Sequence, residues 1–192
     1  MKLPVFKIEW TNNPKVFINQ WSQLYNYPLE KLYSERILLH EYTEEDIRQL
    51  FIWKNGTPLS IRKAESLQTK IICKIKLIND LKKQFRLELF RSEFSNVSAI
   101  WKIYLLHLIA PGLYPIFDQH VYRAYHYIQN QFISEIPSSN RQKEIDYFDN
   151  YVYFFRKLEK LSNSPSKNID EALWAFGKFL KSFTLNLAEL SS

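Results

Sequence analysis

The sequence predicts an all-α fold built as one domain over residues 1–192, and three observations support this prediction. Apolar side chains recur at spacings of three and four along most of the chain, which is the period of an amphipathic helix. Helix start signals, such as Asn13-Pro14 and the capping pair Thr43 and Asp46, precede two of these stretches. The chain has only three glycines, which argues against tightly turned β structure, and no internal repeat divides it.

The elements are expected in the following order. Residues 3–10 are expected to be extended, because apolar and polar side chains alternate there. Helices are expected wherever the apolar period is three to four, over residues 14–25, 28–37, 43–56, 60–90, 97–110, 118–132, 139–161 and 169–183. Gly56 is a typical helix C-terminus, and the stretch 60–90 indicates one long helix or two joined helices.

Composition excludes several classes of protein. Hydrophobic residues make up 46% of the chain, which excludes an intrinsically disordered protein. The most apolar stretch, residues 100–117, contains Lys102, His107 and a Pro-Gly pair, so we expect a core segment there and no membrane partner. No apolar leader follows Met1, and we therefore expect a cytoplasmic protein.

The cysteine and histidine content gives no sign of a metal or a cofactor. The single cysteine, Cys73, allows no internal disulfide, and we expect it to be a small core residue because it lies in a helical apolar run. The four histidines are scattered, and no pair of them has metal-ligand spacing. We therefore expect neither a metal site nor another cofactor.

Basic residues are concentrated in one part of the chain. The formal net charge is +6, and residues 62–91 hold nine basic and three acidic side chains, so this segment alone accounts for it. A cationic segment of this kind is typical of a surface that binds a polyanion. The alternative interpretation is a solvated lysine-rich helix without a partner.

Asp118 marks the start of a predicted helix. It follows four uncharged residues and precedes a helical pattern that begins at Val121. A carboxylate at this position accepts hydrogen bonds from free backbone N–H groups and meets the positive end of the helix dipole. A plain N-cap is therefore one interpretation of Asp118, and a functional carboxylate is the other.

The segment 94–124 resembles the catalytic segment of the helix-hairpin-helix DNA glycosylases. In that superfamily a hairpin of the form Leu-Pro-Gly-Val-Gly precedes, at a nearly fixed distance, an aspartate that begins a helix. Here residues 94–98 stand in register with the hairpin, and Asp118 stands in register with the catalytic aspartate. Val121 and Arg123 follow it, as a valine and an arginine do in the family.

The chain departs from the family pattern at three points. Asn96 and Ser98 replace the two hairpin glycines, which in the family let the backbone approach a DNA phosphate. Ile100 stands where bifunctional members carry a nucleophilic lysine, and Lys102 lies about 200° further round the helix. With one cysteine the chain also lacks the four-cysteine iron–sulfur cluster of some members. The resemblance is thus to a small, divergent branch without lyase activity.

The resemblance implies a fold and an activity. The fold would be a two-lobed helical bundle, with the hairpin and catalytic segment (84–134) at the cleft between the lobes. The activity would be that of a monofunctional DNA glycosylase, which flips a modified or damaged base out of double-stranded DNA and excises it hydrolytically. We expect such a protein to act as a monomer and to associate with the nucleoid.

The resemblance and the local chemistry give a set of candidate site residues. Asp118 is the expected catalytic carboxylate, supported by His120. The candidates for the base pocket or the inserted wedge are Trp53, Lys54, Trp101, Tyr114 and Phe117. The candidates for DNA contacts are Asn96, Ser98, Lys70, Lys74, Lys102 and Arg123.

Several alternatives remain open at this point. Trp53 is also explained as a core residue, and Lys54 as a cation that complements the end of its helix. The whole chain is also compatible with a DNA-binding module that has kept the glycosylase fold without catalysis, or with a helical scaffold that binds RNA. The excised base, and the choice between repair and defence against phage DNA with modified bases, are not readable from the sequence.

Overall fold

The structure, a computed structural model, describes residues 9–190 and the side chains as far as Ser182. The predicted extended segment 3–10 thus lies almost wholly outside the described residues. The described part of the chain is all-helical and contains no strand. Its elements are α1 (Pro14–Ser22), α2 (Glu30–Ser34), α3 (Glu44–Asn55), α4 (Ile61–Lys70), η1 (Ile72–Lys74), α5 (Ile75–Lys83), α6 (Leu87–Glu93), α7 (Ala99–Ile109), α8 (Gln119–Asn130), α9 (Asn140–Ile145), η2 (Asp146–Tyr151), α10 (Val152–Ser162) and α11 (Ser166–Leu190).

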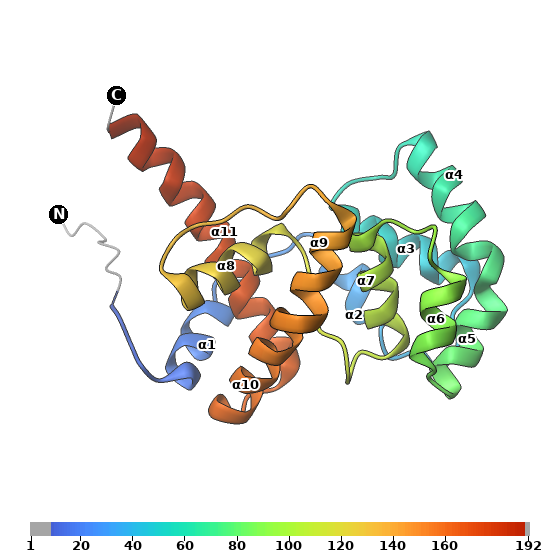
Figure 1. Ribbon diagram of the computed structural model, residues 1–192, viewed down its shortest axis with the longest axis horizontal. Helices are drawn as coiled ribbons and strands as arrows, with labels where there is room; N and C mark the ends of the chain where they lie inside the picture. Colours follow the sequence, from blue (N-terminus) through green and yellow to red (C-terminus); the bar gives the residue numbers. More distant parts are fainter. Residues whose placement is uncertain (1–8, 191–192) are drawn as a thin grey trace.

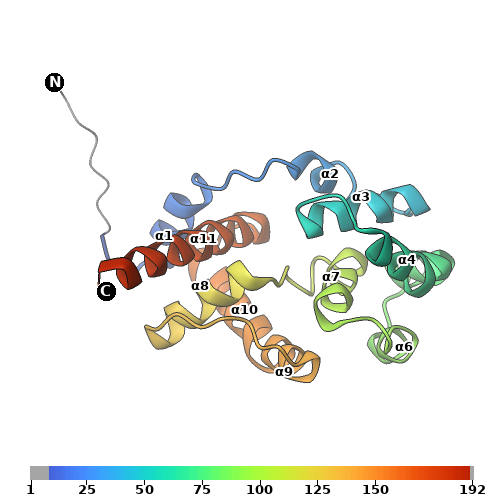
Figure 2. The same cartoon turned by 90° about the horizontal axis from the view of Figure 1, so that it is seen from above.

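The helices are spread along one long axis (Figure 1). Helices α1, α8, α10 and α11 lie at one end, and α11 packs against both α1 and α8. Helices α4, α5 and α6 lie at the other end, with α2, α3, α7 and α9 between the two groups (Figure 2). The long helix α11 therefore supports one end, and the basic segment forms much of the other.

Local signals place several helix ends where the sequence predicts them. The capping box of Thr43 and Asp46 begins α3, and Gly56 ends it with a left-handed φ of 76°. Asn13 caps α1 through its side chain, and Asp118 caps α8 in the same way. These positions depend only on short-range hydrogen bonds, which explains why they are readable from sequence.

The basic segment is not one continuous helix. At Ile71 the backbone leaves helical geometry, with φ −123° and ψ −59°, and the short 3₁₀ turn η1 follows before α5. Ile71 and Ile72 are both fully buried. A straight amphipathic helix presents only one stripe to the core, so burying these two neighbours requires the chain to turn. A second break at residues 84–86 separates α5 from α6.

The predicted helix over residues 139–161 contains a π-helical turn, η2, between α9 and α10. Tyr147 and Tyr151 are fully buried on this turn. The Tyr147 hydroxyl donates a hydrogen bond of 2.9 Å to the carbonyl oxygen of Pro115. The wider turn therefore serves to hold the segment that leads to Asp118, and π turns are common near functional sites.

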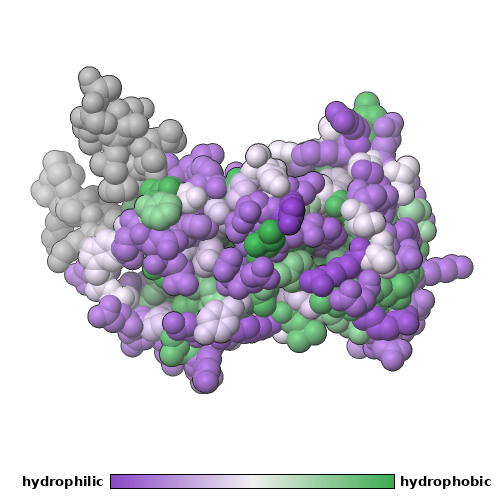
Figure 3. Space-filling view, viewed as in Figure 1, coloured by the Kyte–Doolittle hydropathy of each residue, from purple (hydrophilic) through white to green (hydrophobic). Residues whose placement is uncertain are grey.

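The core is continuous and strongly aromatic. The face shown in Figure 3 is largely hydrophilic, with smaller hydrophobic areas among the hydrophilic side chains. Cys73 is not part of this core. It is exposed, and its thiol donates to the carbonyl oxygen of Thr69. The expectation of a buried cysteine is therefore wrong, because the backbone leaves helical geometry at Ile71, and Cys73 then lies within η1.

The turn between α6 and α7 holds the residues that align with the family hairpin. Phe94 and Val97 are buried, while Asn96 and Ser98 are exposed. Neither of these polar residues has a positive φ, since the non-glycine residues of positive φ in the described chain are Gln131 and Asn163.

No helix of the described chain is long and apolar enough to span a lipid bilayer.

Candidate active site

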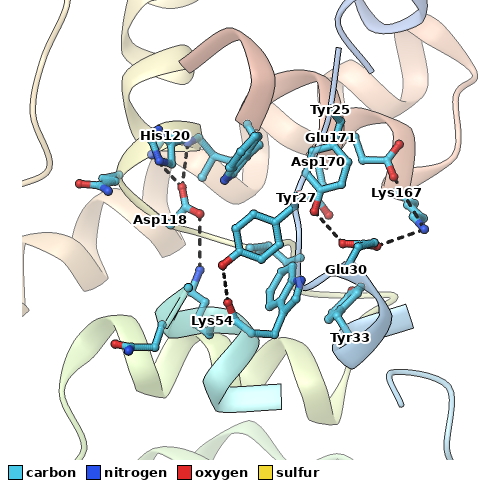
Figure 4. A pocket seen from close by; sticks show the side chains of 17 residues that line it. Tyr25, Tyr27, Glu30, Tyr33, Lys54, Asp118, His120, Lys167, Asp170 and Glu171 are labelled. Atoms are coloured by element: carbon cyan, nitrogen blue, oxygen red, sulfur yellow. Dashed lines mark hydrogen bonds and ion pairs between the residues drawn. The ribbon is translucent and has the colours of Figure 1, made fainter. Parts of the chain in front are cut away.

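A cavity of about 260 Å³ lies where the ends of α3 and α8 meet the start of α11 (Figure 4). Segments far apart in the sequence line it, and most of their side chains are aromatic or charged. The lining residues are Tyr25, Tyr27, Glu30, Tyr33, Trp53, Lys54, Asn55, Gly56, Ile116, Asp118, Gln119, His120, Val121, Lys167, Asp170, Glu171 and Trp174.

Asp118 uses its two carboxylate oxygens differently. Oδ1 accepts hydrogen bonds from the backbone N–H groups of His120 (2.7 Å) and Val121 (3.1 Å). Oδ2 lies 3.8 Å from the Lys54 ammonium, and the side chain keeps 23% of its exposure. The carboxylate is therefore fixed at the start of α8 by one oxygen and presents the other to the cavity.

Lys54 is the cation opposite this carboxylate. Its side chain is only 4% exposed, and its ammonium donates a hydrogen bond of 2.9 Å to the carbonyl oxygen of Phe117. Burial lowers the pKa of Lys54, while the nearby carboxyl groups of Asp118 and Asp170 act in the opposite direction. Lys54 thus ties the last turn of α3 to the residue that precedes Asp118.

His107 holds the same segment from another side. Its Nδ1–H donates to the carbonyl oxygen of Tyr114 (2.7 Å), so its Nε2 accepts the hydrogen bond from the Tyr33 hydroxyl (2.7 Å). Burial lowers the pKa of His107 to about 4. The imidazole is therefore neutral at pH 7 and acts as a fixed bridge. Together with Tyr147, it fixes the course of the chain into Asp118.

Aromatic rings form the walls of the cavity. Trp53 stacks on Tyr33, with ring centroids 4.4 Å apart, and Tyr27 meets the rings of both Trp53 and Trp174 edge-on at 5.6 Å. The Tyr27 hydroxyl donates to the carbonyl oxygen of Trp53 (2.6 Å), which fixes this ring. His120 packs against Trp174 at 5.2 Å. Such walls suit a flat aromatic ligand.

Asp170 brings a second carboxyl group to the cavity. Its Oδ1 atom is buried and has no hydrogen-bond partner. Burial raises the pKa of Asp170 well above its ordinary value, against the opposing effect of Lys54. Two carboxyl groups in different environments therefore face one cavity: one caps a helix and is partly solvated, and the other has a buried oxygen and a raised pKa.

A cluster of four polar side chains lies on the opposite side of the aromatic walls from Asp118. The Lys167 ammonium lies 3.3 Å from a carboxylate oxygen of Glu30 and 3.7 Å from one of Glu171. The Tyr25 hydroxyl donates a hydrogen bond of 2.7 Å to the other carboxylate oxygen of Glu30. We call these four residues, Tyr25, Glu30, Lys167 and Glu171, the distal cluster (Figure 4). Within the described residues, no group of three or more His, Cys, Asp or Glu side chains is arranged to hold a metal ion.

No family model matches the chain, and neither a curated protein nor a solved structure matches it.

Four of the residues singled out in the sequence meet in the cavity, namely Trp53, Lys54, Asp118 and His120. The other three pocket or wedge candidates do not line it. Trp101 packs edge-on against Phe51, Tyr114 packs against Phe85 and Phe148, and Phe117 is fully buried in the core. Apolar spacing alone does not separate a core aromatic from a pocket aromatic, which explains these differences.

Arg123 differs most from its expected place among the DNA contacts. It is 1% exposed, and its guanidinium binds the carboxylate of Glu135 and the carbonyl oxygen of Gly177. An arginine enclosed in this way holds α8 to its neighbours and has no free face for a phosphate. The expectation of a phosphate contact at Arg123 is therefore corrected to a structural role.

The other DNA-contact candidates lie at or near the surface. Lys102 is 13% exposed and pairs with Glu144 at 2.6 Å, and Lys74 pairs with Glu93 at 2.9 Å. Both are thus already engaged within the fold. Lys70 is half-buried at the end of α4, and the exposed residues Asn96 and Ser98 stand on the turn before α7.

Sequence reasoning missed the buried Asp170 and the distal cluster. One signal for Asp170 was present, because it lies three residues before Leu173 on the apolar side of α11, where a carboxylate is unusual. Nothing local marks Tyr25, Glu30 or Lys167. They become a site only because α11 brings its first turn against the segment before α2.

Proposed function

We propose that this chain is a monofunctional DNA glycosylase, which excises a modified or damaged base from double-stranded DNA. One observation carries the proposal. The carboxylate of Asp118 is fixed at a helix start by one oxygen, and its other oxygen faces an aromatic cavity. An N-cap without a further role would have no need of the cavity or of the buried cation opposite it.

The chemistry suits this arrangement. Hydrolysis of an N-glycosidic bond passes through an oxocarbenium-like transition state, so a fixed negative charge beside the sugar lowers the barrier. The base leaves with the bonding electrons, and the oxygen of a water molecule forms a new bond to C1′. The second oxygen of Asp118, which faces Lys54, would orient that water and accept its proton, which then passes to solvent, while the departing base takes up a proton from solvent. The products are the free base and an abasic site.

Lys54 supports the hydrolytic route over a lyase route. Its ammonium donates to the carbonyl oxygen of Phe117 and faces the Asp118 carboxylate, and its side chain is only 4% exposed. Attack of this nitrogen on C1′ would require both contacts to break. Since Ile100 occupies the position of the family's nucleophilic lysine, we expect water to be the nucleophile. Borohydride trapping of a covalent DNA adduct would contradict this part of the proposal.

The walls of the cavity support recognition of a flipped base. Unstacking a nucleotide costs a few kcal/mol, and packing the base between aromatic rings offsets this cost. Trp53, Tyr27 and Trp174 offer such rings. The group of α1, α8, α10 and α11 would serve as one lobe and the rest of the helices as the other, because α3 reaches the cavity from one side and α8 and α11 reach it from the other.

Contacts to the DNA backbone would come from the turn at residues 94–98 and from the basic segment 62–91. The turn is exposed at Asn96 and Ser98, and the buried Phe94 and Val97 anchor it. At the rim of the cavity, Lys63 donates to the side chain of Asn55, which lines it. Cationic side chains therefore extend from the proposed backbone contacts toward the site of the reaction.

The alternative is a DNA-binding module that lacks catalysis, and the loss of both hairpin glycines favours it. One experiment separates the two functions. Purified protein is incubated with duplexes that each carry one damaged or modified base, and the release of free base and the formation of alkali-labile abasic sites are measured. A glycosylase releases base from at least one duplex. Tight binding of every duplex without release from any of them would favour the binding module.

A further inference from the structure

The distal cluster has more polar capacity than a plain nucleobase needs. The edge of a base presents a few donors and acceptors in one plane, and Asp118 and Lys54 already meet one side of the cavity. Glu30, Lys167 and Glu171 add two carboxylates and an ammonium on the opposite side (Figure 4). The cavity thus has a reactive side and a second polar side, with aromatic rings between them.

The chemistry of the cluster favours hydroxyl groups. Glu30 and Glu171 can only accept hydrogen bonds while ionised, and each carboxylate has more acceptor positions than its contacts with Lys167 and Tyr25 occupy. An uncharged hydroxyl fills such positions as a donor and can also accept from Lys167. Hydrogen bonds between hydroxyls and charged groups are among the stronger polar contacts in proteins.

Charged substituents fit the cluster less well. The two carboxylates repel a phosphate or a carboxylate on the ligand. The Lys167 ammonium lies 3.3 Å from a carboxylate oxygen of Glu30 and 3.7 Å from one of Glu171, so it already occupies the position that a cationic substituent would take. It therefore repels an added ammonium. A neutral group that carries several hydroxyls avoids both costs.

The geometry leaves room for a bulky group. Lys167 is 55% exposed, so the cluster opens to solvent and does not close the cavity. The rings of Tyr25 and Trp174 meet edge-on at 5.2 Å beside it, and aromatic faces of this kind pack against the C–H face of a saturated ring.

We propose that the distal cluster is a subsite for a neutral, hydroxyl-rich substituent on the excised base, such as a hexose attached to a pyrimidine. This inference rests on the proposed glycosylase function and names its substrate class. The base would lie among Tyr27, Trp53 and Trp174, with its sugar bond toward Asp118 and its substituent toward Glu30 and Lys167.

The experiment uses a set of duplexes that differ at one position. They carry cytosine, 5-hydroxymethylcytosine, glucosylated 5-hydroxymethylcytosine, a 5-aminoalkyl pyrimidine or an N-methylated purine. Base release is measured with the wild-type protein, and the Kd for each duplex is measured with Asp118→Asn. The release assay tests the proposed function, and the binding assay tests the subsite even where no base is released.

The subsite predicts the lowest Kd for the glucosylated duplex, about tenfold or more below that of the 5-hydroxymethylcytosine duplex. In the Asp118→Asn background, Glu30→Gln should remove most of this preference, since the amide still accepts from Tyr25 but carries no charge. Glu171→Gln is the second variant, for use if Glu30→Gln does not fold. Glu35→Gln is the control. Glu35 follows α2, the helix that begins at Glu30, and lies outside the cavity, so this variant should leave the preference unchanged.

Equal Kd values for the glucosylated and unglucosylated duplexes would overturn the subsite, and so would preferred binding of the cationic bases. Preferred binding of the glucosylated duplex without release of base from any duplex would leave the subsite in place and count against the glycosylase.

Discussion

Gly177 of α11 lies directly against the main chain of His120 in α8. A Cβ atom built on Gly177 would fall 1.9 Å from the carbonyl oxygen of His120 and 2.6 Å from its carbonyl carbon. The two helices therefore cross at a point where only a glycine fits. Because His120 is the second residue after Asp118, this crossing also fixes the start of the helix that Asp118 caps.

Gly177→Ala should destabilise the protein by about 3 kcal/mol or more, because the methyl group meets backbone that has no side-chain freedom to yield. The free energy of unfolding in urea measures this effect. Gly112→Ala is the matched control, since a Cβ atom there has no neighbour within 4 Å, and we expect a change of about 0.5 kcal/mol or less. Equal effects of the two substitutions would show that the helices do not cross as closely as described.

The buried His107 should make the stability depend on pH. Burial lowers its pKa from 6.5 to about 4, so the folded state favours the neutral imidazole. This stability is complete above pH 6.5 and is lost as the pH falls toward 4, because the unfolded state takes up the proton first. We expect the contribution of His107 to the free energy of unfolding to decline by up to about 3 kcal/mol across this window.

His107→Gln isolates this contribution, because glutamine can keep hydrogen bonds to Tyr33 and to the Tyr114 carbonyl without titrating. The raised pKa of the buried Asp170 has the opposite sign and is present in both proteins, so it cancels in the difference. The difference in the free energy of unfolding between the wild type and the variant, measured in urea at several pH values between 4 and 7.5, should shift against the wild type as the pH falls. Parallel curves would argue against a neutral, buried imidazole.

Lys54→Met should slow base release by about 10- to 100-fold, because the variant loses the cation that faces Asp118 and the hydrogen bond to Phe117. Single-turnover kinetics measure the loss. Lys143→Met is a matched control, since Lys143 is also partly buried and donates to a backbone carbonyl, that of Ser138, but it lies outside the cavity and outside the basic segment. Full activity of Lys54→Met would leave Lys54 as a structural cation only.

Asn96→Asp should weaken DNA binding about three- to tenfold at low salt, because it adds a negative charge to the exposed turn proposed to meet a phosphate. The effect should fade as salt is added, and fluorescence anisotropy over a salt series follows both trends. Asn12→Asp places the same charge near α1, at the other end of the molecule, and should bind as the wild type does. Identical affinities of the two variants would remove the turn from the proposed DNA surface.

Local rules predict much of this fold. The start of α1, both ends of α3 and the start of α8 follow from capping side chains and one glycine, and these act within a few residues. The breaks at Ile71 and in η2 do not follow from such rules. They depend on burying Ile72 and Tyr147 against distant parts of the chain, so periodicity alone predicts unbroken helices there.

The residues of the candidate site also fall into those that local sequence signals predict and those that they do not. Asp118 and Lys54 stand at helix ends, and sequence signals mark both positions. In the structure the Lys54 ammonium lies 3.8 Å from a carboxylate oxygen of Asp118. Glu30 and Glu171 carry no local mark, because their proximity depends on how α11 packs against the rest. Arg123 has the sequence position of a functional residue but is buried against Glu135, a contact that spacing does not reveal.

Asp118→Asn tests the central claim most directly, since asparagine is also a good N-cap and should keep α8 folded. The measurement is single-turnover release of base from the duplex that the wild type cleaves best, together with its Kd. A catalytic carboxylate predicts release slowed by about 100-fold or more, with the Kd changed little. Release at the wild-type rate would show that Asp118 only caps its helix, and it would contradict the proposed function.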